Sequence, residues 1–171
     1  MTLPKVIRFW ISLLLLTAAS LTALAQSIPK LEARVTDLTG TLTAEQQTAL
    51  EQKLAAFEAR KGSQIAVLIV PTTQPEDIEG YSIKVFTQAG IGRKKVDDGA
   101  MLLVAKNDRA MRIEVGRGLE GALTDATSKR IVAETITPLF KQGDYSGGIN
   151  AGIDQMIRVA DGEPLPPPDA L

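Results

Sequence analysis

The sequence predicts an α/β fold, a three-layer α/β/α sandwich with a small mixed sheet and helices on both faces. Two runs, Gln64–Val70 and Ala100–Ala105, are apolar almost throughout, which is typical of strands that are covered on both faces. The residues between them recur at helical spacing, so we expect a parallel pair joined by a right-handed crossover. A third run, 111–115, alternates apolar with charged residues and is expected to add an antiparallel strand.

The first helix is predicted between Thr43 and Gly62. Thr43 and Gln46 have the spacing of a capping box, in which each side chain accepts a hydrogen bond from the backbone of the other residue. The apolar residues that follow share one helix face: Leu50, Leu54 and Phe57. Gly62 suits the end of this helix, because glycine readily adopts the left-handed conformation of a C-terminal cap.

Three further helices are predicted from apolar residues that recur at helical spacing. The first lies between the two buried strands and ends at Gly90, the second ends near Gly143, and the third follows it. Their apolar positions are, in order, Ile78, Val85, Phe86 and Ala89; Ile131, Val132, Ile136, Leu139 and Phe140; and Ile149, Ile153, Met156 and Ile157. We expect these residues to form the core, so they carry no information on function.

The segment between the second apolar strand and the alternating strand is predicted to be a hairpin turn. The five residues 106–110 include Asn107 and Asp108, which are common in turns. In such an antiparallel hairpin, the numbers of two residues that face each other sum to about 216. Met101 is therefore expected to face Val115, and Asp98 to face Gly118.

Residues 1–25 have the pattern of a secretory signal peptide, in which two basic residues precede an apolar stretch with a small-residue cleavage pattern at its end. An uncleaved membrane anchor is the alternative, but the apolar stretch is short for a spanning helix and contains polar residues. Cleavage before Gln26 leaves one domain over residues 26–161 and a proline-rich tail over residues 162–171. We therefore expect a periplasmic or secreted monomer without a stable membrane anchor.

The chain of 171 residues contains no histidine and no cysteine. Their absence excludes a Ser-His-Asp triad, a cysteine nucleophile, a disulfide and a His/Cys zinc site. Any catalysis must therefore use carboxylates, hydroxyls, lysine, arginine or a metal that is held by oxygen ligands. The formal net charge of −1 gives no electrostatic reason to expect nucleic acid as a partner.

Carboxylates are expected to gather at one end of the predicted sheet. The hairpin register places Asp97 and Asp98 at the same end as Glu120, and Asp125 returns to it at the start of the next helix. Nearby glycines allow a close approach of the backbone: Gly99, Gly116, Gly118 and Gly121. Crowded carboxylates repel each other by about 4 kcal/mol per pair at roughly 4 Å and an effective dielectric of about 20, so converging carboxylates require a positive partner.

The predicted partner is a divalent cation, Ca²⁺ or Mg²⁺, because both ions prefer oxygen ligands. The candidate ligands are Asp97, Asp98, Glu120 and Asp125. One alternative is that the acids point separately into water, and Asp125 alone is better explained as a helix cap. Another alternative is neutralisation by the nearby cations Arg93, Lys94, Lys95 and Arg117.

Two further observations concern possible ligands. Gly116, Gly118 and Gly121 have the spacing of a dinucleotide-binding fingerprint, but they follow a half-exposed antiparallel strand, which argues against a cofactor. A milder alternative is that their amides form an anion-binding nest. Ligands of open α/β sheets usually bind outside the carboxyl ends of the parallel strands, here 71–73 and the hairpin turn, opposite the acidic end.

Several short motifs follow one another between residues 29 and 158 without large gaps. They are Pro29-Lys-Leu31, Arg34-Val-Thr-Asp37, Leu42-Thr43, Gly92, Asp98-Gly99, Arg112-Ile-Glu-Val-Gly116-Arg-Gly-Leu-Glu-Gly121, Thr124-Asp125 and Phe140-Lys-Gln-Gly-Asp-Tyr145. Together they resemble the TPM domain, a family named for a thylakoid-lumen phosphatase, a photosystem II repair protein and a modulator of acetylcholine receptors. The resemblance implies an α/β/α sandwich outside the cytoplasm, with members that bind calcium or other divalent cations. Carried over by position, the acidic pattern of the family falls on Asp37, Asp98 and Asp125.

Two functions are consistent with the residues and with this resemblance. The first is a non-catalytic module for assembly or maintenance, in which a divalent cation orders the loops that contact an unidentified envelope protein. The second is a weak metal-dependent acid phosphatase, an activity that the resemblance implies for the plant branch. In it, Asp98 would act with the metal and Arg117 or the glycine amides would hold the phosphate. Without histidine, the leaving group would take its proton from a carboxylic acid or bound water, which fits an acidic pH optimum. We favour the accessory module.

Overall fold

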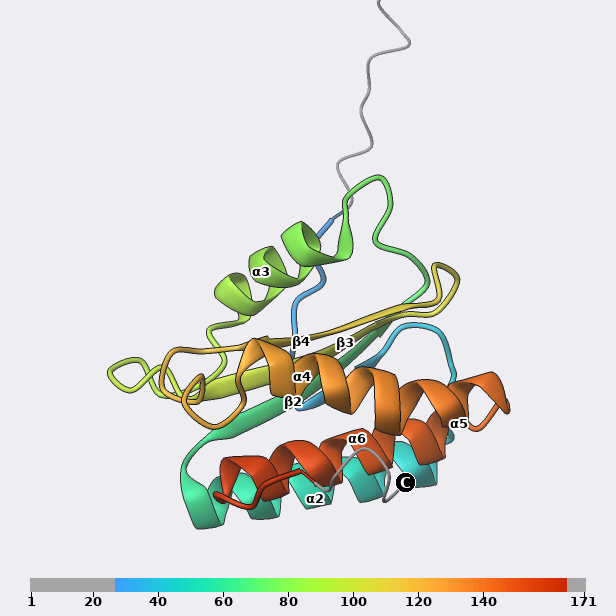
Figure 1. Ribbon diagram of the computed structural model, residues 1–171. Coiled ribbons are helices and arrows are strands. Elements are labelled where there is room, and N and C mark those ends of the chain that lie inside the picture. The colour runs from blue at the N-terminus through green and yellow to red at the C-terminus, as the bar shows by residue number, and fades with distance from the viewer. Residues whose placement is uncertain (1–26, 166–171) are drawn as a thin grey trace, which may run out of the picture.

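The two apolar runs of the sequence form the central strands of a four-stranded sheet in the computed structural model, which describes residues 27–165. Helix α3 covers one face of this sheet and the other helices cover the opposite face (Figure 1), so the predicted three-layer sandwich is confirmed. The predicted signal peptide and the end of the proline-rich tail lie outside the described residues. The elements are β1 (Val35–Asp37), α2 (Ala44–Lys61), β2 (Gln64–Val70), α3 (Ile78–Ala89), β3 (Gly99–Ala105), β4 (Ala110–Val115), α4 (Asp125–Arg130), η1 (Ile131–Ile136), α5 (Thr137–Lys141) and α6 (Tyr145–Ala160).

The central strands β2 and β3 divide the core into two parts. Alternate residues of a strand point to opposite faces, and here both faces are covered. Val67 of β2 belongs to the larger cluster with the residues of α2 and α6, whereas its neighbour Leu68 belongs to the smaller cluster under α3. Both side chains are fully buried. Burial on both faces explains why these two strands are nearly free of polar residues.

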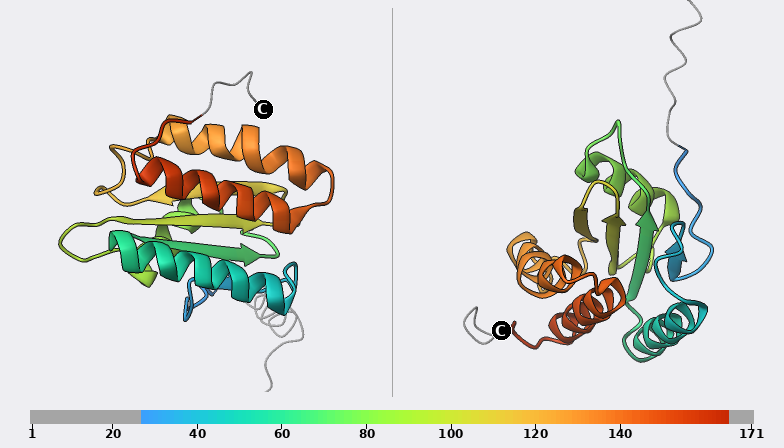
Figure 2. Two further views of the ribbon diagram at one scale, coloured as in Figure 1. Left: turned by 90° about the horizontal axis from the view of Figure 1, so that it is seen from below. Right: turned by 90° about the vertical axis from the view of Figure 1, so that its right-hand side faces the viewer.

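The two parallel connections have opposite hands. The strand order β1-β2-β3-β4 follows the chain, so both connections advance in the same direction across the sheet. Helix α3 crosses one face between β2 and β3, which gives the right-handed crossover that the sequence predicted (Figure 1). Helix α2 crosses the opposite face between β1 and β2, so this crossover is left-handed (Figure 2). About 98% of such connections in proteins are right-handed, so this one needs specific support.

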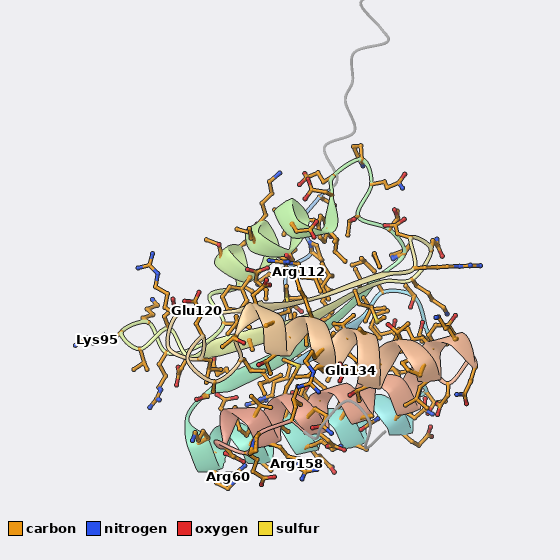
Figure 3. All side chains as sticks on the ribbon, viewed as in Figure 1. Arg60, Lys95, Arg112, Glu120, Glu134 and Arg158 are labelled. Carbon is orange, nitrogen blue, oxygen red and sulfur yellow. The ribbon has the colours of Figure 1, made fainter. Side chains whose placement is uncertain are left out.

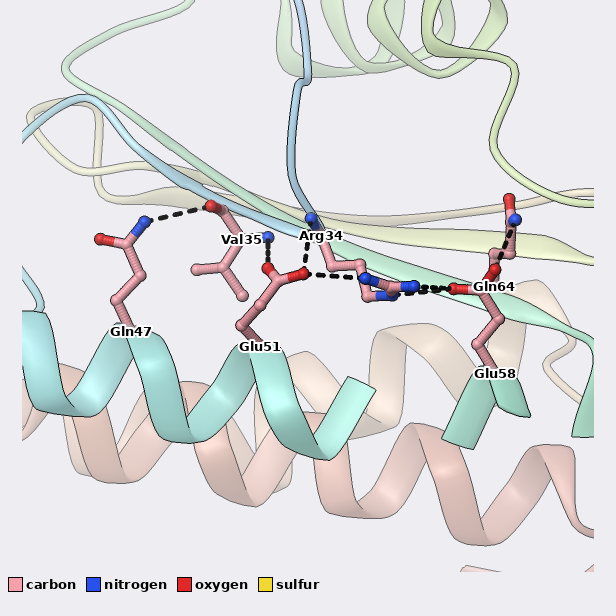
Figure 4. A network of polar contacts seen from close by, with 6 residues as sticks. All are labelled: Arg34, Val35, Gln47, Glu51, Glu58 and Gln64. Atoms are coloured by element: carbon pink, nitrogen blue, oxygen red, sulfur yellow. Dashed lines mark hydrogen bonds and ion pairs between the residues drawn. The ribbon is translucent and has the colours of Figure 1, made fainter. Parts of the chain in front are cut away.

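The support for β1 comes from side chains of α2 (Figure 4). Glu51 accepts hydrogen bonds from the backbone N–H of Val35 at 2.8 Å and of Arg34 at 3.3 Å, and it also pairs with the Arg34 guanidinium at 3.0 Å. The same guanidinium pairs with Glu58 through its Nε at 2.8 Å. Gln47 donates from its amide nitrogen to the carbonyl of Val35 at 3.2 Å. A strand of three residues, which no hydrophobic pattern predicted, is thus tied to the helix that follows it.

Helix α2 has the predicted ends. The side chain of Thr43 accepts from the backbone of Gln46 at 3.2 Å, and the side chain of Gln46 accepts from the backbone of Thr43 at 2.9 Å, which completes the capping box. Gly62 closes the helix in the left-handed conformation with φ of 82°. Of the helices formed by residues 27–165, none is both long and apolar enough to span a membrane.

The register of the β3–β4 hairpin differs from the prediction by one residue. Ala100 pairs with Val115, and Met101 faces Glu114, because the turn contains four residues, 106–109, and not five. Paired side chains share a face, and Met101 packs under α3 whereas Val115 packs on the opposite core. The predicted pair would have joined residues of opposite faces. As a consequence, the carbonyl of Asp97 accepts from Gly118, at 2.8 Å, and Asp98 does not face this glycine.

The helix predicted to begin at Asp125 and to end near Gly143 begins there as α4, but it is not a regular α-helix throughout. After α4 the chain widens into the π-helical segment η1, where the N–H of Thr137 donates to the carbonyl of Val132, five residues earlier. The Thr137 hydroxyl donates to the same carbonyl at 2.8 Å. Pro138 follows and has no N–H to donate, so the regular α-helical bonding is interrupted there. The apolar spacing of the sequence does not indicate this change from α-helical to π-helical hydrogen bonding.

Replacing Glu51 by Ala is expected to lower the free energy of unfolding by about 2 kcal/mol. The buried N–H of Val35 then loses its partner, and a buried donor without a partner costs about 1 to 3 kcal/mol. Gln52→Ala is the matched control, since Gln52 is an exposed neighbour on the same helix and should change stability by less than about 0.5 kcal/mol. Urea unfolding measures both, and equal losses would show that Glu51 does not hold β1.

Candidate functional site

The predicted site lies at the amino end of the sheet, where β2 and β3 begin, and here the backbone is closely packed. A Cβ atom added to Gly99 would lie 2.2 Å from the carbonyl oxygen of Ile91, and one added to Gly118 would lie 2.3 Å from that of Val96. Gly116 is similarly close to Asp97, at 2.4 Å, whereas Gly121 has nothing within 4 Å. The predicted close approach is therefore confirmed for three of the four glycines, and it brings residues 91–98 against residues 116–118.

The carboxylate of Asp98 is bonded to three groups at this end. Its Oδ1 accepts from the backbone N–H of Arg93 at 2.9 Å, and its Oδ2 accepts from Nε of the Arg93 guanidinium, also at 2.9 Å. The hydroxyl of Ser63, just before β2, donates to Oδ2 at 3.1 Å. Asp98 is 2% exposed, so it belongs to the interior of the protein and ties the loop 91–98 to the starts of both central strands.

These bonds also set the protonation of Asp98. Burial alone would raise the pKa of the carboxyl group, because the charged form loses its hydration. The hydrogen bonds and charge of Arg93, with the hydroxyl of Ser63, outweigh burial and lower the pKa of Asp98 from 3.8 to about 2. A carboxylate with this pKa is ionised throughout the physiological range and does not act as a proton donor.

The other predicted acids at this end have separate partners or face water. Asp97, at a left-handed φ of 55°, accepts from the backbone N–H of Arg117 at 3.1 Å. Asp125 is the first residue of α4, whose cap is Thr124 and not Asp125 as the sequence suggested, and it pairs with Lys129 at 2.7 Å. Glu120 is exposed, and it lies at the same end of the molecule as Lys95 (Figure 3).

Asp37 lies at the other end of the sheet. Asp37 pairs with Ile69 of β2, whereas Gly99, which follows Asp98, pairs with Gln64 of the same strand. The two acids are therefore separated by about 17 Å along the strand direction. The carboxylate of Asp37 accepts from the backbone of Thr39 and Leu42, each at 2.8 Å. Burial raises the pKa of Asp37, but these bonds outweigh it and the pKa is lowered. Asp37 therefore holds the turn before α2 and cannot share a cation with Asp98.

The predicted residues do not fit a single divalent cation in this arrangement. Within residues 27–165, no three acidic side chains are close enough to hold one metal ion. Asp98 is instead paired with Arg93, which is the neutralisation that the sequence left open. The four acids Asp97, Asp98, Glu120 and Asp125 lie at the end of the sheet that the sequence predicted, but their carboxylates do not converge. Binding of Ca²⁺ or Mg²⁺ itself stays a prediction.

Two polar groups were missed by the sequence reasoning. Arg112 and Glu114 were assigned to the solvent side of β4, but α3 covers that side, and Glu114 accepts from Arg112 at 2.8 Å and from the buried hydroxyl of Ser82 at 2.7 Å. The buried hydroxyl of Ser128 has no hydrogen-bond partner among the described residues and borders a hollow of about 140 Å³ beside Arg112. Alternation along β4 could not reveal which helix lies above it.

A larger groove, of about 510 Å³, lies at the carboxyl end of the sheet. The β3–β4 turn forms one side of it and the turn between α5 and α6 forms the other. Its charged lining is basic: Lys106, Arg109 and Lys141. The sequence pointed to this end only through the general rule that ligands bind at the carboxyl ends of parallel strands. The basic residues come from segments about thirty positions apart, so no local pattern connected them.

A family model described as the TPM domain matches residues 35–159 of the chain. The match runs from β1 into the last turn of α6, so it includes both ends of the sheet. No curated protein matches the chain.

Solved structures from three bacteria are similar to this chain. The N-terminal domain of a protein from P. gingivalis, solved by NMR, is 32% identical with a TM-score of 0.69, and the alignment covers 75% of this chain and 82% of that chain. BA42 from the psychrophilic Bizionia argentinensis is 22% identical with a TM-score of 0.63, covering 74% and 86%. The N-terminal domain of cg2496 from Corynebacterium glutamicum is 19% identical with a TM-score of 0.58, covering 82% and 86%. The last two similarities concern the fold alone.

Replacing Asp98 by Asn is expected to lower the free energy of unfolding by about 2 kcal/mol at about pH 7, because each unit of lowered pKa corresponds to about 1.4 kcal/mol. The pKa in the folded protein lies below that of the unfolded chain. This contribution is therefore complete above about pH 4 and is lost as the pH falls to about 2, so the difference between wild type and variant shrinks on acidification. Urea unfolding followed by circular dichroism at both pH values measures it.

Asp97→Asn is the matched control for this measurement. Asp97 is the exposed neighbour, and asparagine tolerates its left-handed backbone, so the loss should stay below about 0.5 kcal/mol. A deficit of Asp98→Asn that persists undiminished at low pH would contradict the role given to its carboxylate.

Proposed function

Because this chain belongs to the TPM domain family, we propose that it is an exported accessory module that binds a partner in the cell envelope and does not transform a substrate. The observation that carries this proposal is the bonding of Asp98. The one buried carboxylate among residues 27–165 is bonded to Arg93 and Ser63. Its position in the family's acidic pattern is thus explained by a structural role in the loops at the amino end of the sheet.

A phosphatase would need groups that these residues do not supply in this arrangement. Phosphoryl transfer to water at acidic pH requires a proton donor for the leaving group, and the low pKa of Asp98 makes it a poor one. Arg117 is exposed, and its backbone rather than its side chain contacts Asp97. The sequence contains no histidine or cysteine that could serve as the proton donor or the nucleophile instead. These points favour binding over turnover.

Partner binding of this kind requires no divalent cation. Asp98 is neutralised by Arg93, and Asp125 is paired with Lys129, so neither carboxylate needs a metal to offset its charge. Export is supported by the signal-peptide pattern of residues 1–25. The unidentified envelope partner then meets a folded domain whose loops are already held by internal bonds.

One expression experiment tests both parts of the proposal. The full chain is produced in a Gram-negative bacterium and purified from the periplasmic fraction. We expect an intact mass that lacks residues 1–25, with Gln26 as the first residue. The same protein should not hydrolyse p-nitrophenyl phosphate at acidic pH above the rate in buffer, with Mg²⁺ or Ca²⁺ present, and its Arg117→Ala variant should behave in the same way.

The variant is a suitable control because the side chain of Arg117 is exposed and forms no hydrogen bond or ion pair with the described part of the chain, residues 27–165. Its melting temperature should equal that of the wild type. Turnover by the wild type that falls at least about tenfold in Arg117→Ala would reverse the choice in favour of a phosphatase. Retention of the intact chain in the cytoplasm would contradict export.

A further inference from the structure

The groove at the carboxyl end of the sheet, which we call the basic groove, combines charged and apolar surfaces. It has a volume of about 510 Å³, within the range of about 300 to 1,000 Å³ that is typical of ligand pockets. Lys106 and Arg109 from the β3–β4 turn and Lys141 from the end of α5 supply its charge. Its apolar lining includes Met111 and Phe140.

The cations of the basic groove are not ion-paired with acidic side chains of the described residues. No acidic residue lines it, and Lys106, Arg109 and Lys141 form no ion pair with any acidic side chain in residues 27–165. The two acids close to it in sequence have other partners. Asp108 accepts from the Thr72 hydroxyl at 2.7 Å, and Asp144 accepts from the Gly147 N–H at 2.8 Å as the cap of α6. Three cations that form no ion pair within residues 27–165 thus line the same groove.

Aromatic rings hold one side of the basic groove in shape. The ammonium group of Lys106 lies 4.9 Å from the centre of the Tyr145 ring, a cation–π distance. The rings of Phe140 and Tyr145 meet edge to face, with their centres 4.9 Å apart. The basic groove therefore presents apolar ring surface directly beside positive charge, which suits a ligand that has both acidic and apolar groups.

Arg109 occupies a backbone conformation that disfavours it. Its φ is 53°, in the left-handed region that glycine and asparagine adopt most readily in hairpin turns. A turn selected for stability alone would place glycine at this position. Residues kept in such conformations cluster at binding sites, where the side chain has a use that the backbone does not supply.

We propose that the basic groove binds an acidic peptide segment of a partner protein, with its carboxylates on Lys106, Arg109 and Lys141 and an apolar side chain against Met111 and Phe140. This inference rests on the proposed accessory function and names the partner's chemistry. A peptide fits better than a free phosphate, because one phosphate would leave the apolar lining and most of the volume unused. Acidic peptides are recognised by clusters of cations in this way.

The test is a calorimetric titration of the purified protein with two synthetic peptides of about eight residues. In one, glutamate and aspartate flank a phenylalanine; in the other, glutamine and asparagine replace the acids. We expect the acidic peptide to bind and the neutral peptide not to bind. The double variant Arg109→Gly with Lys141→Gln should weaken binding by at least about tenfold, since hydrogen bonds to charged groups are lost.

Lys95→Gln is the matched control, because it removes one positive charge from an exposed loop at the opposite end of the sheet. Binding in this variant should stay within about twofold of the wild type. Arg109→Gly alone should raise the melting temperature while it weakens binding, because glycine relieves the left-handed backbone, so unfolding cannot explain the loss.

Three results would overturn the proposal. They are absence of binding by the acidic peptide at millimolar concentration, equal loss of affinity in Lys95→Gln and the double variant, and binding of inorganic tripolyphosphate but not of the peptide. None of them would affect the accessory role, which depends on export and on the absence of phosphate turnover. Conversely, a phosphatase that also bound the peptide in the basic groove would contradict the proposed function and leave the groove assignment standing.

Discussion

The ion pair between Asp98 and Arg93 is the contact on which the arrangement of the amino end depends. A buried carboxylate is stable only if it is bonded to donors, and Asp98 has the guanidinium, a backbone N–H and the Ser63 hydroxyl as its donors. These donors come from the loop before β3 and from the start of β2. The pair therefore fixes where both central strands begin. With the glycines of residues 116–118 packed against the same loop, it also fixes the end of β4.

This bonding gives the two ends of the sheet different characters. At the amino end, Asp97 and Asp98 are used within the protein, and the backbone is packed too closely to admit a ligand between the loops. At the carboxyl end, the basic groove has cations that pair with no acidic side chain of residues 27–165, and they lie beside half-buried aromatic rings. The comparison favours a protein that binds at the carboxyl end and uses its acidic residues as structural ties. It also agrees with the usual position of ligands in open α/β sheets.

The sequence predicted the features that depend on local interactions. The capping box of Thr43, the strands buried on both faces and the right-handed crossover follow from spacing and burial, and they are confirmed. Strand β1 was missed because its three residues are held by side chains of α2 and not by an apolar pattern. The hairpin register was wrong by one residue because it depends on turn length, and the turn has four residues. The position of Asp98 at the amino end was predictable, but the choice between a cation and Arg93 depended on side-chain geometry.

The most direct measurement for this account is a titration of the ¹⁵N-labelled protein with Ca²⁺, observed through the amide signals of Arg93, Asp98 and Arg117. If Asp98 is satisfied by its internal bonds, none of these signals should show a saturable shift up to about 1 mM, the range in which weak extracellular calcium modules bind. A saturable shift of all three signals, together with stabilisation of the protein by Ca²⁺ that Asp98→Asn abolishes, would show that the acids form a metal site and would contradict the account.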